Sequence, residues 1–246
     1  MHNRPNVINI GAGKAGTTSL HKYMSQHPEI FGSEEKELMY FSSRFGRGVE
    51  WYRSNFPEQE GVRVYFETTP QYSFRDEFPL VPQRIHDFNP EMRLIYIVRE
   101  PLSRITSHFN HWSRVNPDRY TDIEQTLANA EQRKFFVDRT RYFYQISAYF
   151  DIFPEEQVKV VFLEDIKNNF VPSMNEVCRF LGVTEIAASI EPTVHNRGAT
   201  NKRTGAFRDD ISPERSQEIC QTLSEDVQQL LSHCGKPRDF WGVSYT

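Results

Sequence analysis

The chain has 246 residues, of which 25% are charged, and its formal net charge is −4. This balance excludes the strongly basic composition typical of nucleic-acid binding, so no nucleic-acid partner is expected and an anionic ligand must be held by a local arrangement. The length suits one large α/β domain or two small ones, and we expect a single domain over residues 1–246. Three scattered cysteines are too few for a disulfide framework or a zinc site, which favours a reducing compartment.

The N-terminal residues run directly into the first apolar segment. They show no basic stretch followed by the apolar core of a signal peptide, and no window approaches 18 uninterrupted apolar residues. We therefore expect a cytoplasmic protein without a transmembrane segment. A catalytic domain cut from a larger anchored protein would have the same features, and the sequence leaves the oligomeric state open.

The segment 7–20, VINIGAGKAGTTSL, is a β-branched run that breaks into glycines and then into two threonines. It predicts a strand, a tight turn and a helix that ends near His27, because Pro28 disfavours helical backbone at the residue before it. A turn of this kind can hold a phosphate group at a helix N-terminus.

Three interpretations of this turn compete. The spacing of Gly11, Gly13 and Gly16 fits the dinucleotide-binding fingerprint. The P-loop of a kinase would instead require a lysine directly after the last glycine, where the chain has Thr17. In the third interpretation the important cation is Lys14, inside the turn, followed by two hydroxyl groups at the start of the helix.

Three further runs rich in β-branched and aromatic residues predict buried parallel strands at 62–66, 93–98 and 158–162. Helices are expected at 80–88, 101–114, 121–134, 140–153, 171–181 and 212–233. This alternation predicts an α/β fold with a central parallel sheet flanked by helices, and ligands beyond the carboxyl ends of the strands.

The segment after the strand at 93–98 adds a second candidate phosphate site. Arg99 ends this strand, Pro101 begins a helix, and Ser107 lies eight residues after the arginine. One guanidinium and one hydroxyl group could therefore meet at a single phosphate. Each could equally have a structural partner, a surface carboxylate for Arg99 and its own helix for Ser107.

Taken together, the two segments resemble the sulfotransferase superfamily, which transfers a sulfuryl group from 3′-phosphoadenosine 5′-phosphosulfate (PAPS). The first turn is similar to the 5′-phosphosulfate loop of that family, and IVREPLSRITSHF, residues 97–109, to its 3′-phosphate motif. The segments 24–41, 67–72 and 142–181 resemble further parts of heparan sulfate and bacterial carbohydrate sulfotransferases. Thr68 departs from the pattern, since many relatives have lysine there. The resemblance implies a fold like that of P-loop kinases.

The resemblance also implies roles for individual residues. Lys14 would stabilise the negative charge that develops on the bridging oxygen of the leaving phosphate, and no metal ion is required. The 5′-phosphate would lie against the backbone N–H groups of residues 15–18. The residues implied in binding PAPS are Lys14, Ala15, Gly16, Thr17, Thr18, Ser19, Arg99 and Ser107, with Arg197, Lys202 and Arg203 in a late polar loop.

The acceptor must lose a proton during transfer, so a general base is expected. The catalytic glutamate of heparan sulfate 3-O-sulfotransferases falls on Lys22 here, so that base is missing. Glu35, which resembles the glutamate of tyrosylprotein sulfotransferases, is the first candidate, although the run SEEKE could form a solvated face. Glu67, expected at a strand end facing the cleft, is the second, and His21 and His108 remain possible by residue type.

Other functions fit the sequence less well. A dinucleotide-binding oxidoreductase could use Glu34 or Glu35, but only Ile30 and Phe31 are available for the strand before them. A P-loop kinase would need a carboxylate for magnesium at a strand end, where Asp165 is the one candidate. A nucleotide-binding domain without catalytic activity is the non-enzymatic alternative. The resemblance implies a carbohydrate or a sugar-containing small molecule as the acceptor.

Overall fold

The computed structural model describes residues 4–192 and 211–245. They divide into two compact units, which we call the sheet unit (residues 1–98 and 146–195) and the helical unit (residues 99–145 and 196–246). The expectation of a single domain over 1–246 therefore stays a prediction. Three of the expected donor-binding residues, Arg197, Lys202 and Arg203, lie outside the described residues.

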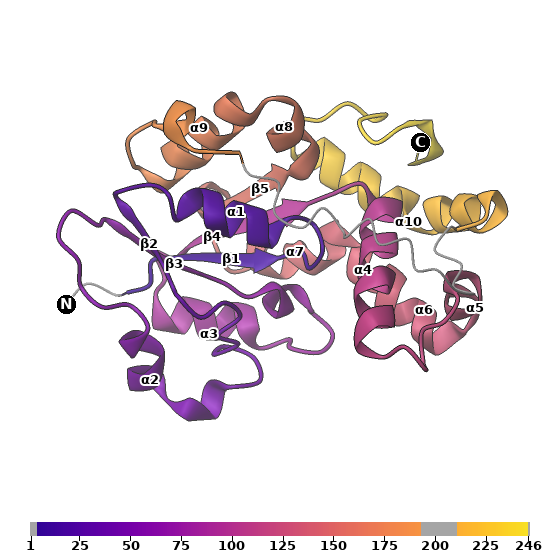
Figure 1. The fold of residues 1–246 in the computed structure, drawn as a ribbon, viewed down its shortest axis with the longest axis horizontal. Coiled ribbons are helices and arrows are strands. Elements are labelled where there is room, and N and C mark those ends of the chain that lie inside the picture. The colour runs from indigo at the N-terminus through magenta and orange to yellow at the C-terminus, as the bar shows by residue number, and fades with distance from the viewer. Residues whose placement is uncertain (1–3, 193–210, 246) are drawn as a thin grey trace. The chain divides into compact units, whose positions relative to one another are not determined.

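The sheet unit contains a five-stranded parallel sheet, as predicted (Figure 1). Its strands are β1 (Val7–Gly11), β2 (Ile30–Gly32), β3 (Val64–Thr68), β4 (Arg93–Val98) and β5 (Val158–Phe162), in the order β2-β3-β1-β4-β5. Every residue of β1 and β3 is buried, and β4 is buried from Leu94 onward. Near-continuous burial is what a parallel strand covered on both faces requires.

Two strands differ from the sequence-based expectation. The third strand is Val64–Thr68 rather than 62–66, because the buried part of the chain continues past the apolar run into two polar residues. Ile30–Gly32 forms an edge strand, with Ile30 opposite Val64 and Gly32 opposite Phe66. Three residues are too few to show a strand pattern, so only the pairing with β3 reveals this strand.

The strand order bears on the dinucleotide-binding alternative. In a dinucleotide-binding sheet of order 3-2-1-4-5-6, the second strand lies beside the first, which brings its terminal acid to the ribose. Here β3 lies between β1 and β2. The acids that follow β2 are therefore one strand further from the first turn than that interpretation needs.

Helices cover both faces of the sheet. Figure 1 shows α8 (Leu163–Asn168) and α9 (Phe170–Leu181) on one side of the strands, and α2 (Val49–Ser54) and α3 (Val81–Phe88) on the other. On the α9 side, α1 (Thr17–Met24) buries Leu20, Tyr23 and Met24 in one core with strand residues and α9. The face towards α2 and α3 is largely aromatic, with ring contacts among Phe41, Tyr52, Tyr72 and Phe88. Helix α1 ends three residues before His27.

The helical unit contains α4 (Pro101–Val115), α5 (Ile123–Ala128), α6 (Ala130–Val137), α10 (Pro213–His233) and the start of α7 (Tyr142–Phe150). The expected helix at 121–134 is two helices, because Asn129 adopts extended backbone and its side chain caps α6 by accepting from the Gln132 amide. Asp226 of α10 accepts hydrogen bonds from the Phe143 and Tyr144 amides at the start of α7.

Candidate active site

The turn after β1 leads directly into α1. The Ala12 amide donates to the Ile97 carbonyl at 2.7 Å, which ties the start of the turn to β4. Lys14 and Gly16 both have left-handed backbone, with φ of 69° and 108°. Glycine is favoured at position 16 by this conformation, and a Cβ atom there would lie 2.8 Å from Leu163 Cδ1, so that side chain would have to shift.

The first turn of α1 offers amides to an anion. These N–H groups have no acceptor within the helix, and the first turn carries no acidic residue. Thr17 is buried and Thr18 is half-buried, as is Ser19. The Ala15 amide donates to the Ala12 carbonyl at 3.1 Å, so this expected phosphate donor already has an acceptor. Amides from the start of α1 are better placed for that role.

A second lysine joins this turn. Lys36 Nζ donates a hydrogen bond to Thr18 Oγ1 at 2.7 Å. Burial lowers the pKa of Lys36, and the ammonium groups of Lys14 and Lys22 lower it further, while Glu37 raises it. The sequence analysis missed Lys36 because it read the run SEEKE as a solvated face. No sequence signal could have found it, because β2, the strand that precedes it, is revealed only by its pairing with β3.

His21 is a buried residue of α1. Its Nδ1 lies 2.9 Å from Thr68 Oγ1, it hydrogen-bonds the Ser33 backbone, and its ring contacts Phe66. Burial, followed by the charge of Lys36, lowers the pKa of His21 to about 4. The buried ring is held by these contacts, which makes His21 a structural residue and a poor candidate for the base.

The segment after β2 runs along the end of β3. The Ser33 amide donates to the Phe66 carbonyl and the Glu37 amide donates to the Thr68 carbonyl, each at 2.9 Å. Glu37 and Met39 have left-handed φ values of 60° and 55°, and Glu37 is exposed. Left-handed backbone in non-glycine residues costs free energy and is concentrated at functional sites. Glu37 is a carboxylate that the sequence analysis did not consider.

Glu35, the first candidate base, forms an ion pair with Arg44. Its Oε1 lies 3.0 Å from Arg44 Nη1, and the two side chains are 55% and 36% exposed. One carboxylate oxygen therefore already accepts from a guanidinium. An exposed pair of this kind contributes little to stability, and solvent competes for it.

Glu67, the second candidate base, is the penultimate residue of β3, as expected, but its side chain is fully buried. Its carboxylate accepts hydrogen bonds from the hydroxyl groups of Tyr52 at 2.6 Å, Thr69 at 2.7 Å and Tyr72 at 3.0 Å. Burial raises the pKa of Glu67 to about 6, and these three hydrogen bonds oppose the rise.

The hydroxyl groups that bind Glu67 also hold the segment after β2. Thr69 Oγ1 accepts from the Met39 amide at 3.3 Å, and the Tyr72 hydroxyl group accepts from the Phe41 amide at 3.2 Å. Glu67 is thus the centre of a buried hydrogen-bond network that fixes the backbone next to Glu37.

The expected 3′-phosphate residues belong to the helical unit. Arg99 is half-buried, and its carbonyl accepts from the Tyr142 hydroxyl group at 2.8 Å. Glu100 caps α4 by accepting from the amides of Leu102 and Ser103, and Ser107 is half-buried further along that helix. The convergence of Arg99 and Ser107 with the Lys14 turn stays a prediction.

His108, the other candidate histidine, lies in the aromatic core of the helical unit. It is 5% exposed, stacks on Phe135 with ring centroids 4.9 Å apart, and accepts from Trp112 Nε1 at 3.0 Å. Packing in this aromatic core is therefore sufficient to explain why His108 is buried.

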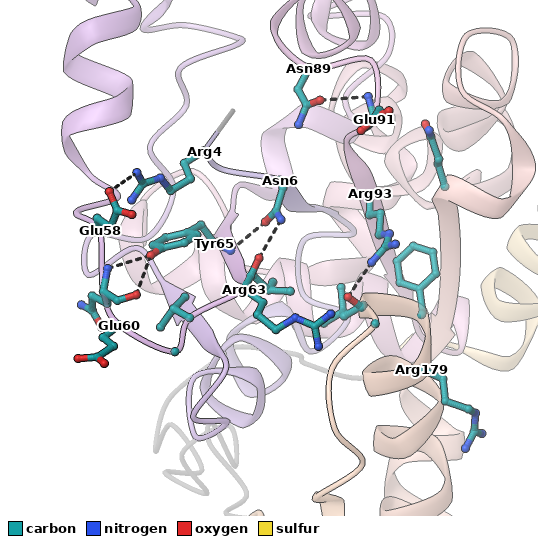
Figure 2. Close-up of a pocket in the computed structure, with 18 of the residues that line it drawn as sticks. Arg4, Asn6, Glu58, Glu60, Arg63, Tyr65, Asn89, Glu91, Arg93 and Arg179 are labelled. Carbon is teal, nitrogen blue, oxygen red and sulfur yellow. Dashed lines mark hydrogen bonds and ion pairs between the residues drawn. The ribbon is translucent and has the colours of Figure 1, made fainter. Parts of the chain in front are cut away.

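An open cavity of about 1370 Å³ lies at the amino ends of β1, β3 and β4, the end of the strands opposite to the turn that carries Lys14 (Figure 2). Its arginines have protein partners: Arg4 pairs with Glu58 at 3.0 Å, and Arg93 donates to the Leu181 carbonyl at 2.6 Å. Ligands of α/β sheets bind at the carboxyl ends, so this cavity is distinct from the turn that carries Lys14.

A family model described as "Sulfotransferase domain" matches residues 4–234, most of the chain. The chain belongs to the sulfotransferase domain family. It is 28% identical to human heparan sulfate glucosamine 3-O-sulfotransferase 5 over 189 residues, which are 73% of this chain and 54% of that protein. The chain thus spans about half the length of the curated sulfotransferases it matches first.

Solved sulfotransferase structures share the fold. A sulfotransferase from Alicyclobacillus acidocaldarius is 25% identical and superimposes with a TM-score of 0.79, over 97% of this chain and 98% of that chain. Mouse sulfotransferase SULT7A1, solved in complex with PAP, superimposes with a TM-score of 0.55 at 18% identity, over 94% and 88% of the two chains. The predicted family and fold are therefore confirmed. None of the helices within residues 4–192 and 211–245 is long and apolar enough to cross a membrane.

Proposed function

We propose that this chain transfers the sulfuryl group of PAPS to a hydroxyl group of an acceptor. The observation that carries the proposal is the turn between β1 and α1, where Lys14 precedes a helix start that has no acid and holds two threonine hydroxyl groups. Such a start favours an anion, and a cation beside it suits a leaving phosphate. Membership of the sulfotransferase domain family supports the same conclusion.

We propose for the donor-binding residues the roles that the resemblance to sulfotransferases implies. Lys14 offers its ammonium to the oxygen that bridges sulfur and phosphate, where negative charge develops as that bond breaks. The amides and hydroxyl groups of Thr17, Thr18 and Ser19 bind the 5′-phosphate. Arg99 and Ser107 bind the 3′-phosphate, and Arg197, Lys202 and Arg203 complete the donor site.

A carbohydrate is the acceptor that we propose. The support is the similarity to a protein named for its action on heparan sulfate. A hydroxyl group of a glycan is a weak nucleophile, so a base must accept its proton during the attack on sulfur. The proposal is a direct in-line transfer without a covalent intermediate on the protein.

Three carboxylates compete for the role of base. We propose Glu37, because it is exposed, follows Lys36 directly and is held in a strained conformation by the Thr68 carbonyl. Glu35 remains a candidate, but its ion pair with Arg44 would have to break before it could accept a proton. Glu67 would have to leave three hydroxyl partners and become accessible.

Calorimetric titration with adenosine 3′,5′-bisphosphate (PAP) tests the proposal, beside adenosine 5′-phosphate, NADH and ATP with magnesium. We expect PAP to bind at least tenfold more tightly than adenosine 5′-phosphate, since a charge-assisted hydrogen bond contributes roughly 1.5–3 kcal/mol. Arg99→Ala should remove most of this preference. A preference for NADH or for ATP with magnesium would reject the proposed donor.

A transfer assay completes the test of the reaction. Purified protein is incubated with PAPS labelled in the sulfuryl group and with a heparan sulfate oligosaccharide. Label is expected on the oligosaccharide, with equimolar PAP. Tight binding of PAP without transfer to any carbohydrate would instead support the non-catalytic nucleotide-binding domain.

A further inference from the structure

Lys36 comes from a different element from Lys14, yet it reaches the same helix start. It follows β2, and its Nζ lies 2.7 Å from Thr18 Oγ1 in the first turn of α1. Lys36 and Thr18 are 18 positions apart in the sequence, so the fold, and not local sequence, brings them together. The hydroxyl group of Thr18 accepts from Lys36 and keeps its own hydrogen for donation to a ligand.

The ammonium of Lys36 is partly buried and lies near charges of both signs. Burial is the main cause of its lowered pKa, the carboxylate of Glu37 opposes this effect, and Lys14 and Lys22 lower the pKa further. Its charge also helps to keep His21 neutral. A partly buried ammonium with a single hydrogen-bond acceptor is stabilised further when an anionic ligand binds to it.

Lys36 has donors left for such an anion. One of its three N–H groups goes to Thr18, and within the described part of the chain it has no other hydrogen bond and no ion pair. A side chain needed only to support Thr18 would not need to be a lysine, since any donor at this position would serve.

We infer that Lys36 is a second catalytic cation of this site, whose ammonium binds the sulfuryl oxygens of PAPS while Lys14 binds the bridging oxygen. The inference rests on the proposed function. In the transfer, the bond from sulfur to the phosphate oxygen breaks and its electron pair leaves with the phosphate. The bond from sulfur to the acceptor oxygen forms, and the acceptor proton passes to the carboxylate base. Lys36 keeps its proton throughout and stabilises charge on the sulfuryl oxygens.

The test compares the affinities for PAPS and PAP, because only PAPS carries the sulfuryl group. We expect Lys36→Met to weaken PAPS binding roughly 10–100-fold, as for loss of a charge-assisted hydrogen bond. PAP binding should change by less than about threefold, within the range of a surface charge change. Lys36→Arg, which keeps the charge, should retain most of the affinity for PAPS.

Two further variants separate direct contact from support of Thr18. Thr18→Val should weaken PAPS and PAP binding alike, because the proposed ligand of its hydroxyl group is the 5′-phosphate that both nucleotides contain. Lys167→Met, which removes an exposed lysine of α8, controls for the loss of one positive charge and should leave both affinities unchanged.

Each outcome decides the inference. Equal loss of PAPS and PAP affinity in Lys36→Met, or no loss of either, overturns it and leaves the proposed function intact. Wild-type protein that binds neither nucleotide overturns the proposed function, and the inference with it. If Lys36→Met does not fold, Lys36→Gln and Lys36→Arg give the same comparison.

Discussion

Lys14 and Gly16 share left-handed backbone for different reasons. At Gly16, with φ of 108°, a Cβ atom would be unfavourable and would also lie 2.8 Å from Leu163 Cδ1. At Lys14 the conformation, with φ of 69°, is unfavourable for a residue with a Cβ, by roughly 1–2 kcal/mol. A glycine would relieve this strain, so the presence of lysine indicates that its ammonium is needed at this point of the turn.

Replacing Lys14 tests its role at the residue scale. We expect Lys14→Ala to lower kcat by about 10²–10³-fold or more, as for removal of a group that stabilises developing charge. The affinity for PAP should fall much less, because the amides of α1 still bind the 5′-phosphate. Steady-state transfer kinetics and calorimetry measure the two effects, and Lys167→Ala is the matched control. An unchanged kcat would remove Lys14 from the mechanism.

At the scale of elements, the segment between β2 and α2 is irregular but firmly held. Its amides pair with the Thr68 carbonyl, with Thr69 Oγ1 and with the Tyr72 hydroxyl group. The last two of these acceptors donate to Glu67. The backbone of this segment therefore depends on one buried carboxylate, which can accept several hydrogen bonds at once.

Comparison of Glu37→Gln with Glu67→Gln separates the base from the residue that positions it. Glu37→Gln should lower kcat by about 10²–10⁴-fold, the usual contribution of a general base, and leave the melting temperature unchanged. Glu67→Gln should lower the free energy of unfolding by about 1–3 kcal/mol, because the amide nitrogen cannot accept from a hydroxyl group. Its kcat should fall less than that of Glu37→Gln. Glu35→Gln tests the remaining candidate, whose carboxylate pairs with Arg44.

The kinetic results assign the base directly. A large loss of kcat in Glu67→Gln with an unchanged melting temperature would move the role to Glu67. A large loss in Glu35→Gln alone would restore the first candidate of the sequence analysis.

At the scale of the whole molecule, the free energy of unfolding should depend on pH through buried groups whose contributions change in opposite directions with pH. The pKa of His21 falls from 6.5 to about 4, so its contribution to stability is present above pH 6.5 and is lost as pH falls towards 4. The pKa of Glu67 rises from 4.5 to about 6, so its contribution is fully present below pH 4.5 and is lost as pH rises through 6. The pKa of Asp226 is also raised, to about 6, so its contribution to stability is likewise lost as pH rises through 6.

His21→Asn isolates one of these contributions. The Asn side chain can still accept from Thr68 but does not titrate. The free energy of unfolding of the wild type, relative to this variant, should fall by about 3 kcal/mol between pH 7 and pH 4, since one pKa unit corresponds to about 1.4 kcal/mol. Urea unfolding at a series of pH values measures the difference. Parallel profiles for the two proteins would mean that His21 is not held neutral.

Much of the fold could be predicted because apolar runs identify buried strands wherever they lie. β4 and β5 match their expected bounds, and α4 differs by one residue. The errors have a common cause. Ile30–Gly32 is too short to show a period, and Glu67 and Thr68 extend β3 although they are polar, because pairing with β1 places them in the sheet.

The sequence by itself determined the parts of this protein that depend on neighbouring residues. The order of lysine, glycine and two threonines specifies a turn that opens a helix, and the spacing of its glycines fits the tight backbone. Only the tertiary structure decided which charged groups belong to that turn. Lys36 reaches Thr18 because the segment after β2 is hydrogen-bonded along the end of β3, and Glu67 is buried in a network of hydroxyl groups contributed by other segments. Contacts of this kind depend on strand order and burial, which a local pattern of residues does not contain.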